Sequence, residues 1–196
     1  PADDHPVVNV SWNDAMAFCE WLSRPAGATC RLPTEAEWEF ACRAGNPGRY
    51  SFGNEESRLA DHAWYENHGG VGTKPVGQKA PNPLGLFDLH GNVWEWCLDG
   101  YGPYDSAHVI DPVRTTRKGR RVTRGGAFST QSSAVRSARR SADPPTTSFL
   151  VNGFRVVLTA QAIRKIQGGK PAPPSEDHDT TREEAAPPPD GTEDGH

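Results

Sequence analysis

Cysteine is scarce in this sequence, and its spacing matches no zinc motif. The four cysteines contain no CxxC pair, and no His/Cys cluster has the spacing of zinc ligands. The seven histidines are scattered along the chain, which argues against a histidine-based metal site. No apolar run reaches the roughly 18 residues that a membrane-spanning helix needs, so the sequence predicts no membrane span.

A concentrated basic stripe is also missing. Residues 171–196 contain eight acids and one base, Arg182, which leaves this tail at −7 and residues 1–170 at +3. A mildly basic body without a stripe gives no support for nucleic-acid binding. Because the Pro- and acid-rich composition cannot bury enough surface to offset ordering entropy, we predict a linker and disordered tail over 161–196. Residues 1–160 are predicted to form the folded domain.

Two segments carry clear helix signals. Ser11-Trp12-Asn13-Asp14 has an N-cap serine with an acid at the third helical position, and apolar residues follow at helical spacing. This predicts a helix over about 11–23 that Pro25-Ala26-Gly27 ends. Thr34-Glu35-Ala36-Glu37 is a full capping box and predicts a second helix that ends before Gly45.

Beyond these helices, regular patterns nearly vanish. Residues 59–65 and the Gly- and Pro-rich segments around them are predicted to be aromatic-rich loops. Arg121–Phe128 and Phe154–Leu158 are predicted to be strands. The sequence therefore favours a fold with much ordered loop and a small sheet.

The stretch from Gly85 to Trp96 is the most unusual part of the chain. If residues 92–96 are extended, the two tryptophans share one face and Glu95 lies on the other. A carboxylate between buried side chains needs a partner, which is either an arginine or a metal ion. For a metal, Asp88 and Glu95 would supply carboxylates, and the residues between them carbonyl oxygens. Such oxygen-only ligation suits calcium.

Four ordered motifs with matching spacing resemble the formylglycine-generating enzyme (sulfatase-modifying factor) family. They are the Gly85–Trp96 stretch, Arg31–Glu39, Arg124-Gly125-Gly126 and Gly153-Phe154-Arg155. The resemblance implies an α+β fold of the C-type-lectin-like kind, with two helices, a small twisted antiparallel sheet and much loop. It also implies that the chain holds roughly the C-terminal two-thirds of the family domain.

The resemblance assigns metal ligands. In the family, the positions that match Asp88, Gly91, Val93 and Glu95 hold a structural calcium, and Asp61 lies where a second calcium is bound. The resemblance also implies a reaction, in which a sulfatase cysteine is oxidised to formylglycine with oxygen and a copper ion held by two thiolates. Copper(I) prefers such soft sulfur ligands.

Three positions in the reaction segment depart from the family. Thr130 and Val135 stand where the family has the two copper thiolates, and Ala127 stands where it has a serine. Copper is therefore not expected here. Cys19 and Cys42 match positions that form structural disulfides in some members, but the partner positions are Ala138 and Val156, so both cysteines are expected to be small core residues.

Neither Cys30 nor Cys97 has a second thiol at a useful spacing. Among the arginines, Arg124 and Arg155 are expected to pair with Glu35, Glu37, Glu39 or Glu95. The remaining candidates, Arg136, Arg139 and Arg140, are interpreted as lining a groove for an acidic ligand, because guanidinium groups bind carboxylates bidentately.

Three functions follow from this reading. The first is a non-oxidase, calcium-stabilised binding or accessory module for a peptide or protein in a groove near Thr130–Arg140. The second is a formylglycine-generating oxidase with other ligands, and the third is another oxidoreductase on the same scaffold. The third alternative includes the iron-dependent sulfoxide synthases, which need a three-histidine site, and no His-x3-His is present. Fold alone does not decide between them.

Overall fold

The computed structural model describes residues 3–104, 109–115, 119–158 and 163. Apart from Ile163, the predicted tail lies outside these residues. The helices are α1 (Trp12–Ala26), α2 (Glu35–Arg43) and α3 (Leu59–His62), with 3₁₀ turns η1 (Glu56–Arg58) and η2 (Ser132–Ala134). The strands are β1 (Cys30–Arg31), β2 (Trp94–Gly100), β3 (Arg121–Arg124), β4 (Arg140–Asp143), β5 (Asn152–Gly153) and β6 (Val157–Leu158).

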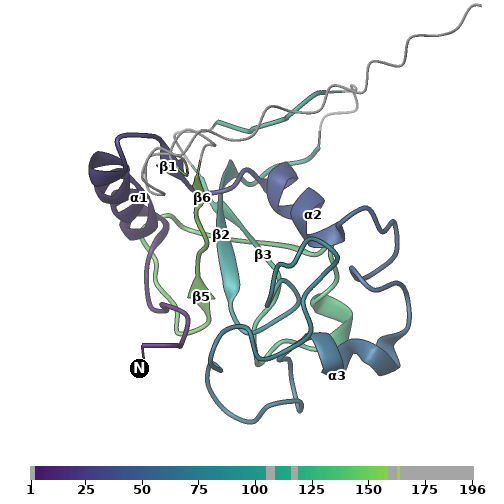
Figure 1. Cartoon of the computed structure of the whole chain (residues 1–196). Coiled ribbons are helices and arrows are strands. Elements are labelled where there is room, and N and C mark those ends of the chain that lie inside the picture. Colours follow the sequence, from purple (N-terminus) through teal and green to yellow (C-terminus); the bar gives the residue numbers. More distant parts are fainter. Residues whose placement is uncertain (1–2, 105–108, 116–118, 159–162, 164–196) are drawn as a thin grey trace, which may run out of the picture.

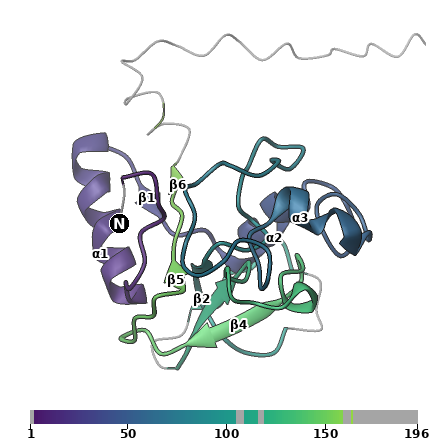
Figure 2. The same cartoon turned by 90° about the horizontal axis from the view of Figure 1, so that it is seen from below.

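The strands form two sheets between the helices. One sheet has four strands in the order β4-β3-β2-β5, and β1 pairs with β6 in a separate two-stranded sheet. Figures 1 and 2 show α1 on one side of the molecule next to β1 and β6, and α2 and α3 on the other side. The fold is α+β, as predicted, and long loops join most of its elements.

The four-stranded sheet is mixed and not purely antiparallel. β2 pairs antiparallel with β3, but it pairs in parallel with β5, where Glu95 lies opposite Gly153. Side-chain patterns do not reveal strand direction, so the predicted antiparallel sheet was wrong at this one edge. β2 is the central strand, and Glu95, Trp96 and Cys97 are all buried because both faces of the strand are covered.

Both predicted helices are present, and their caps explain their ends. The Ser11 side chain accepts a hydrogen bond from the Asp14 N–H, and the Asp14 carboxylate accepts one from the Ser11 N–H. α1 continues to Ala26, beyond the predicted end, because Pro25 is accommodated in the last turn and Gly27 provides the left-handed cap. α2 ends at Arg43 with Ala44 as a left-handed cap.

A third helix occupies part of the segment predicted to be loop. Residues 56–62 form the 3₁₀ turn η1 followed by the single helical turn α3. Leu59 is fully buried in a cluster with Tyr50 and Val135, so tertiary packing stabilises a helix that is too short to show a period in the sequence. The predicted strands are likewise shorter than expected, since β3 ends at Arg124 and the 154–158 segment contributes only β6.

Candidate functional site

Buried ion pairs connect the helix α2 to the four-stranded sheet. Arg124 on β3 has a fully buried side chain that pairs with Glu39 and Glu35 on α2, and its Nη1 donates to the Arg139 carbonyl at 2.7 Å. Arg140 on β4 donates to both oxygens of Glu35, at 2.6 and 2.8 Å. The expected pairing of Arg124 with the α2 carboxylates is confirmed, and it fixes α2 against the sheet.

Glu95 is held by an arginine, which is one of the two partners that its position in the sequence left open. Arg155 donates from Nε to Oε2 and from Nη2 to Oε1, both at 2.6 Å. The Trp38 indole also donates to Oε2 at 2.7 Å. Both carboxylate oxygens therefore have partners, as a carboxylate that is 5% exposed requires.

Asp88 retains one oxygen without a partner. Its Oδ2 accepts the Gly77 N–H at 2.8 Å, whereas Oδ1 is buried and makes no hydrogen bond. Burial raises the pKa of this carboxyl, although the Gly77 N–H and the nearby Arg155 charge oppose that shift. An unpaired buried carboxylate oxygen is a position that a cation would satisfy.

The rest of the predicted calcium set is partly engaged. The Gly91 carbonyl accepts the Val93 N–H at 2.9 Å, and Glu95 is shared with Arg155. Asp61, the candidate for a second calcium, has an exposed side chain, and its carbonyl accepts the Ala80 N–H at 2.9 Å. Among the described residues, no three His, Cys, Asp or Glu side chains cluster as a metal site, so any calcium would depend on backbone carbonyls.

The two positions that the resemblance assigns to copper thiolates lie against one tight turn. The Thr130 hydroxyl accepts the Ala127 N–H at 2.9 Å. Val135 is fully buried, and a Cβ on the neighbouring Gly126 would lie only 2.6 Å from its Cγ1. These contacts give both side chains structural roles, with a hydroxyl and a methyl group in place of sulfur.

A buried histidine forms a hydrogen bond with the backbone next to this turn. His90 is 3% exposed, and its Nδ1 lies 2.9 Å from the Val135 carbonyl. Its Nε2 is 3.1 Å from both the N–H and the hydroxyl of Ser51. Because the Ser51 N–H can only donate, Nε2 must be the acceptor and Nδ1 must carry the proton. Burial lowers the pKa of His90 to about 4 and keeps the ring neutral.

The cysteines fall into two groups. Cys42 and Cys97 are buried in one core cluster, and Cys19 and Cys30 in another. All four thiols are free. The sequence spacing indicated no second thiol for Cys30, whereas the fold places Cys30 and Cys19 in the same cluster. The chain turns back at Gly27, so two cysteines that are eleven residues apart in the sequence lie in one cluster.

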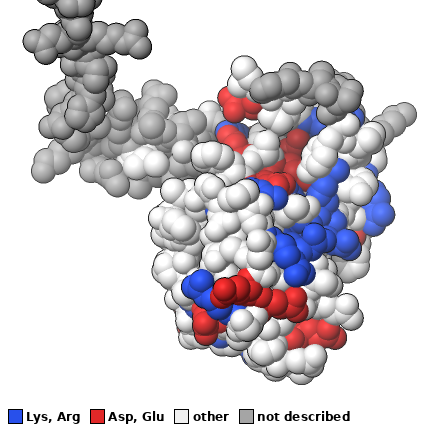
Figure 3. Space-filling model, turned by 90° about the vertical axis from the view of Figure 1, so that its right-hand side faces the viewer, with Lys and Arg blue, Asp and Glu red and all other residues white. Residues whose placement is uncertain are grey.

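The three arginines of the predicted groove differ in their partners. Arg140 is committed to Glu35, and Arg136 donates from Nε to the Ser133 carbonyl at 2.7 Å. Arg139 is exposed. In Figure 3, basic side chains gather in one patch with acidic side chains on both sides of it, so this face is mixed in charge.

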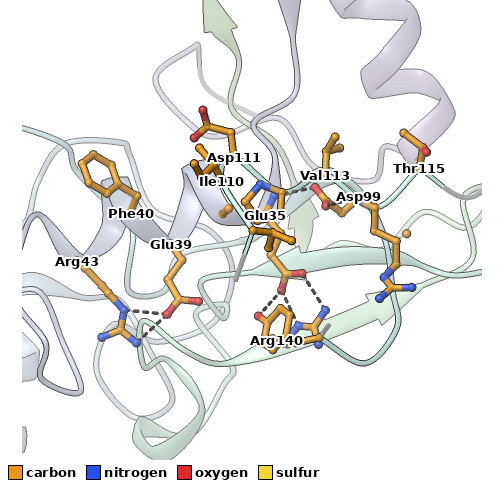
Figure 4. Close-up of a pocket in the computed structure, with 16 residues that line it drawn as sticks. Glu35, Glu39, Phe40, Arg43, Asp99, Ile110, Asp111, Val113, Thr115 and Arg140 are labelled. Atoms are coloured by element: carbon orange, nitrogen blue, oxygen red, sulfur yellow. Dashed lines mark hydrogen bonds and ion pairs between the residues drawn. The ribbon is translucent and has the colours of Figure 1, made fainter. Parts of the chain in front are cut away.

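A cleft of about 910 Å³ lies between α2 and residues 109–115. Figure 4 shows Glu35 directed at Arg140 and Glu39 directed at Arg43 in its wall. Phe40, 75% exposed, adds apolar surface. The wall carboxylates of Glu35 and Glu39 are thus engaged in ion pairs, and no sequence signal indicates this cleft because its walls come from distant segments.

A second, polar pocket of about 370 Å³ borders the reaction segment. The pocket is lined by one segment, Gln131–Ser133, by a second segment, residues 65–68, and by Glu56. The two segments are joined by the Glu66 N–H, which donates to the Thr130 carbonyl at 2.9 Å. This pocket therefore lies directly beside the position of Thr130.

Together, the fold and these sites define a loop-rich α+β domain in which arginine pairs fix the motifs and the reaction segment lacks thiols. The sequence of residues 1–160 matches the family model of the sulfatase-modifying factor enzyme 1-like domain. The chain belongs to this family.

Two curated proteins and one solved structure are similar to this chain. The formylglycine-generating enzyme of Thermomonospora curvata is 40% identical over 172 residues, which cover 78% of this chain and 55% of that protein. The mouse inactive C-alpha-formylglycine-generating enzyme 2 is 44% identical over 108 residues, covering 50% of this chain and 33% of that protein. The structure of Treponema denticola variable protein 1 superposes with a TM-score of 0.74 at 28% identity, covering 80% of this chain and 72% of that one.

The chain spans about half the length of the curated enzymes that it matches. Within the described residues, no helix combines the length and the apolar character needed to cross a bilayer.

Proposed function

We propose that this chain is a non-oxidase member of the sulfatase-modifying factor family that binds a peptide or protein. The observation that carries the proposal is the use of Thr130 and Val135. One caps a turn through its hydroxyl and the other fills the core against Gly126. Neither side chain offers the soft sulfur that copper(I) prefers.

The polar pocket beside Thr130 is the proposed binding site. Its walls, residues 65–68 and Ser132–Ser133, offer hydroxyl, amide, imidazole and backbone groups that suit the hydrogen bonds of an extended peptide. Arg136, bound to the Ser133 carbonyl, adds a positive charge close to it. The proposed binding site does not include Arg139 or Arg140. The charge of Arg140 is neutralised by Glu35.

Copper(I) titration and oxygen consumption test the proposal. Two proteins are assayed with a cysteine peptide of the sulfatase type. One is the Cys30→Ser variant, which lacks the Cys19–Cys30 thiol pair, and the other is the same variant with Thr130→Cys and Val135→Cys added. We expect neither tight copper(I) binding nor thiol-dependent oxygen consumption in the Cys30→Ser variant. The protein with the two added cysteines should gain copper(I) binding, because the two positions flank one turn. Oxygen consumption by the Cys30→Ser variant would refute the non-oxidase assignment.

A peptide-library screen tests the binding arm. The matched variants are Ser132→Arg, which blocks the polar pocket, and Glu20→Lys on α1, which changes an exposed residue on the other side of the molecule. Selected peptides should lose at least tenfold in affinity with Ser132→Arg and retain it with Glu20→Lys. Equal loss in both variants would remove the pocket from consideration.

We also propose that calcium stabilises the Asp88–Glu95 turn. The unpartnered Asp88 Oδ1 supports this, and the Gly91 and Val93 carbonyls and Glu95 would complete the oxygen ligands, with Glu95 shared with Arg155. Calcium content and the thermal midpoint are measured before and after a chelator, with Asp88→Asn as the matched variant. We expect about one calcium per chain, a fall in midpoint on chelation and no such fall in the variant. A metal-free protein with an unchanged midpoint leaves the Arg155 pair as the complete account of Glu95.

A further inference from the structure

Cys19 and Cys30 belong to the same small core cluster although they lie on different elements. Cys19 is on α1 and Cys30 is on β1, and they pack with Ala15, Leu32 and Trp96. Their exposed fractions are 2% and 4%. Each thiol affects the pKa of the other through a side-chain hydrogen bond, which indicates that the two side chains lie close together in this cluster.

Ser23 fixes the two backbones in this arrangement. Its hydroxyl donates to the Cys19 carbonyl at 2.8 Å and lies 3.2 Å from the Cys30 carbonyl. The same oxygen accepts the Cys30 N–H at 2.9 Å. One side chain therefore bridges both cysteine residues and fixes their backbones relative to each other.

We propose that Cys19 and Cys30 are a disulfide-forming pair, which links α1 to β1 when the protein meets a small-molecule disulfide. A thiolate of the pair attacks one sulfur of the oxidant and releases the first thiol. The second cysteine then attacks the mixed disulfide and releases the second thiol. The protein loses two protons and two electrons, and the oxidant is reduced to two thiols.

The rate of this exchange depends on how much of each cysteine is present as thiolate. Burial raises the pKa of both cysteines, to about 12 for Cys19, but the Cys19 thiol opposes this shift at Cys30 by donating to its sulfur. Because the thiolate is the reactive form, the native protein is oxidised slowly at neutral pH and faster at alkaline pH.

The other two cysteines provide an internal control. Cys42 and Cys97 share a core cluster, but the Cys42 sulfur lies 3.8 Å from the Leu89 carbonyl and the Cys97 sulfur 3.9 Å from the Glu95 carbonyl. Neither is the hydrogen-bond partner of another thiol. The pairing is therefore expected to be specific to the first cluster.

The Cys19–Cys30 disulfide bond would link α1 to the two-stranded sheet. β1 pairs with β6 through Cys30 and Leu158, so the link would join α1 to the strand at the end of the described domain. It closes a short loop around Gly27, and such a link stabilises a fold mainly by restricting the unfolded chain. The oxidised protein should accordingly unfold at a higher temperature than the reduced protein.

The test is oxidation with a glutathione redox buffer, applied to the native protein and during refolding from urea. Free thiols are then counted under denaturing conditions, and the tryptic peptide that ends at Arg31 is weighed. This peptide contains both cysteines, because trypsin does not cleave between Arg24 and Pro25. We expect the free thiols to fall from four to two and the peptide to lose two hydrogens.

Two variants separate the possible outcomes. Cys42→Ser should still form the link, whereas Cys19→Ser should form none and should retain only a mixed glutathione adduct at Cys30. In the native protein the rate should rise about tenfold per pH unit near neutrality. Four free thiols after refolding in the oxidising buffer, or a link that involves Cys42 or Cys97, would overturn the proposal.

Discussion

Lowering the pH should destabilise this domain through His90. In the folded state the ring is neutral, because Nε2 accepts the Ser51 N–H while Nδ1–H donates to the Val135 carbonyl. A second proton would place an N–H at Nε2 against the Ser51 N–H, inside a site that is almost completely buried. The folded state therefore resists protonation, and the pKa of His90 is lowered from 6.5 to about 4.

The size of the effect follows from proton linkage. Below pH 6.5 the unfolded chain binds a proton at this histidine that the folded chain does not bind, so stability is lost as the pH falls towards 4. The loss amounts to about 2 kcal/mol between about pH 7.5 and pH 5, and to about 3 kcal/mol by about pH 4. Measurements above about pH 5 also avoid most of the carboxylate titration.

Urea unfolding at about pH 7.5 and pH 5 measures this difference. His90→Gln should be less stable at both pH values but should lose most of the pH dependence. The matched control His68→Gln removes an exposed histidine and should retain the dependence, because His90 is still present. A smaller residual slope is expected from His62, whose pKa burial also lowers. If His90→Gln keeps the full difference of about 2 kcal/mol, the assignment of the neutral buried ring is wrong.

Two further predictions concern the packed motifs. Glu95→Gln should cost about 2–3 kcal/mol in urea unfolding, somewhat less than a fully buried pair, because 30% of the Arg155 side chain is exposed. The control Glu37→Gln removes a partly exposed pair and should cost about 1 kcal/mol or less; an equal loss in both variants would contradict the reasoning. Gly126→Ala should cost about 1–3 kcal/mol, because its φ is 83° and a Cβ would lie 2.6 Å from Val135. Combining it with Val135→Ala should recover part of the clash in a double-mutant cycle, and strict additivity would argue against direct contact.

The helices were predictable because their signals are local. Ser11 with Asp14, and Thr34 with Glu37, are each three residues apart, and the resulting capping boxes form as predicted. The third helix was missed because α3 has only one turn, which is too short for a periodic pattern and depends on burial of Leu59.

The partner of Glu95 illustrates a choice that the sequence leaves open. A buried carboxylate needs compensation, and arginine and calcium both provide it. Arg155 is 60 residues away and reaches Glu95 because β5, just before it, pairs in parallel with β2. The register of these two strands decides the contact, and no local pattern in either segment encodes that register.

The sequence by itself determined where α1 and α2 begin, that the chain carries the family motifs, and that Thr130 and Val135 replace the expected thiols. These properties depend on residue type and short spacings. Only the tertiary structure decided that Arg140 is neutralised by Glu35, that His90 supports the Val135 turn, and that Cys30 lies against Cys19. Each of those contacts depends on how the chain folds back on itself, because the energy of a contact depends on three-dimensional distance and burial.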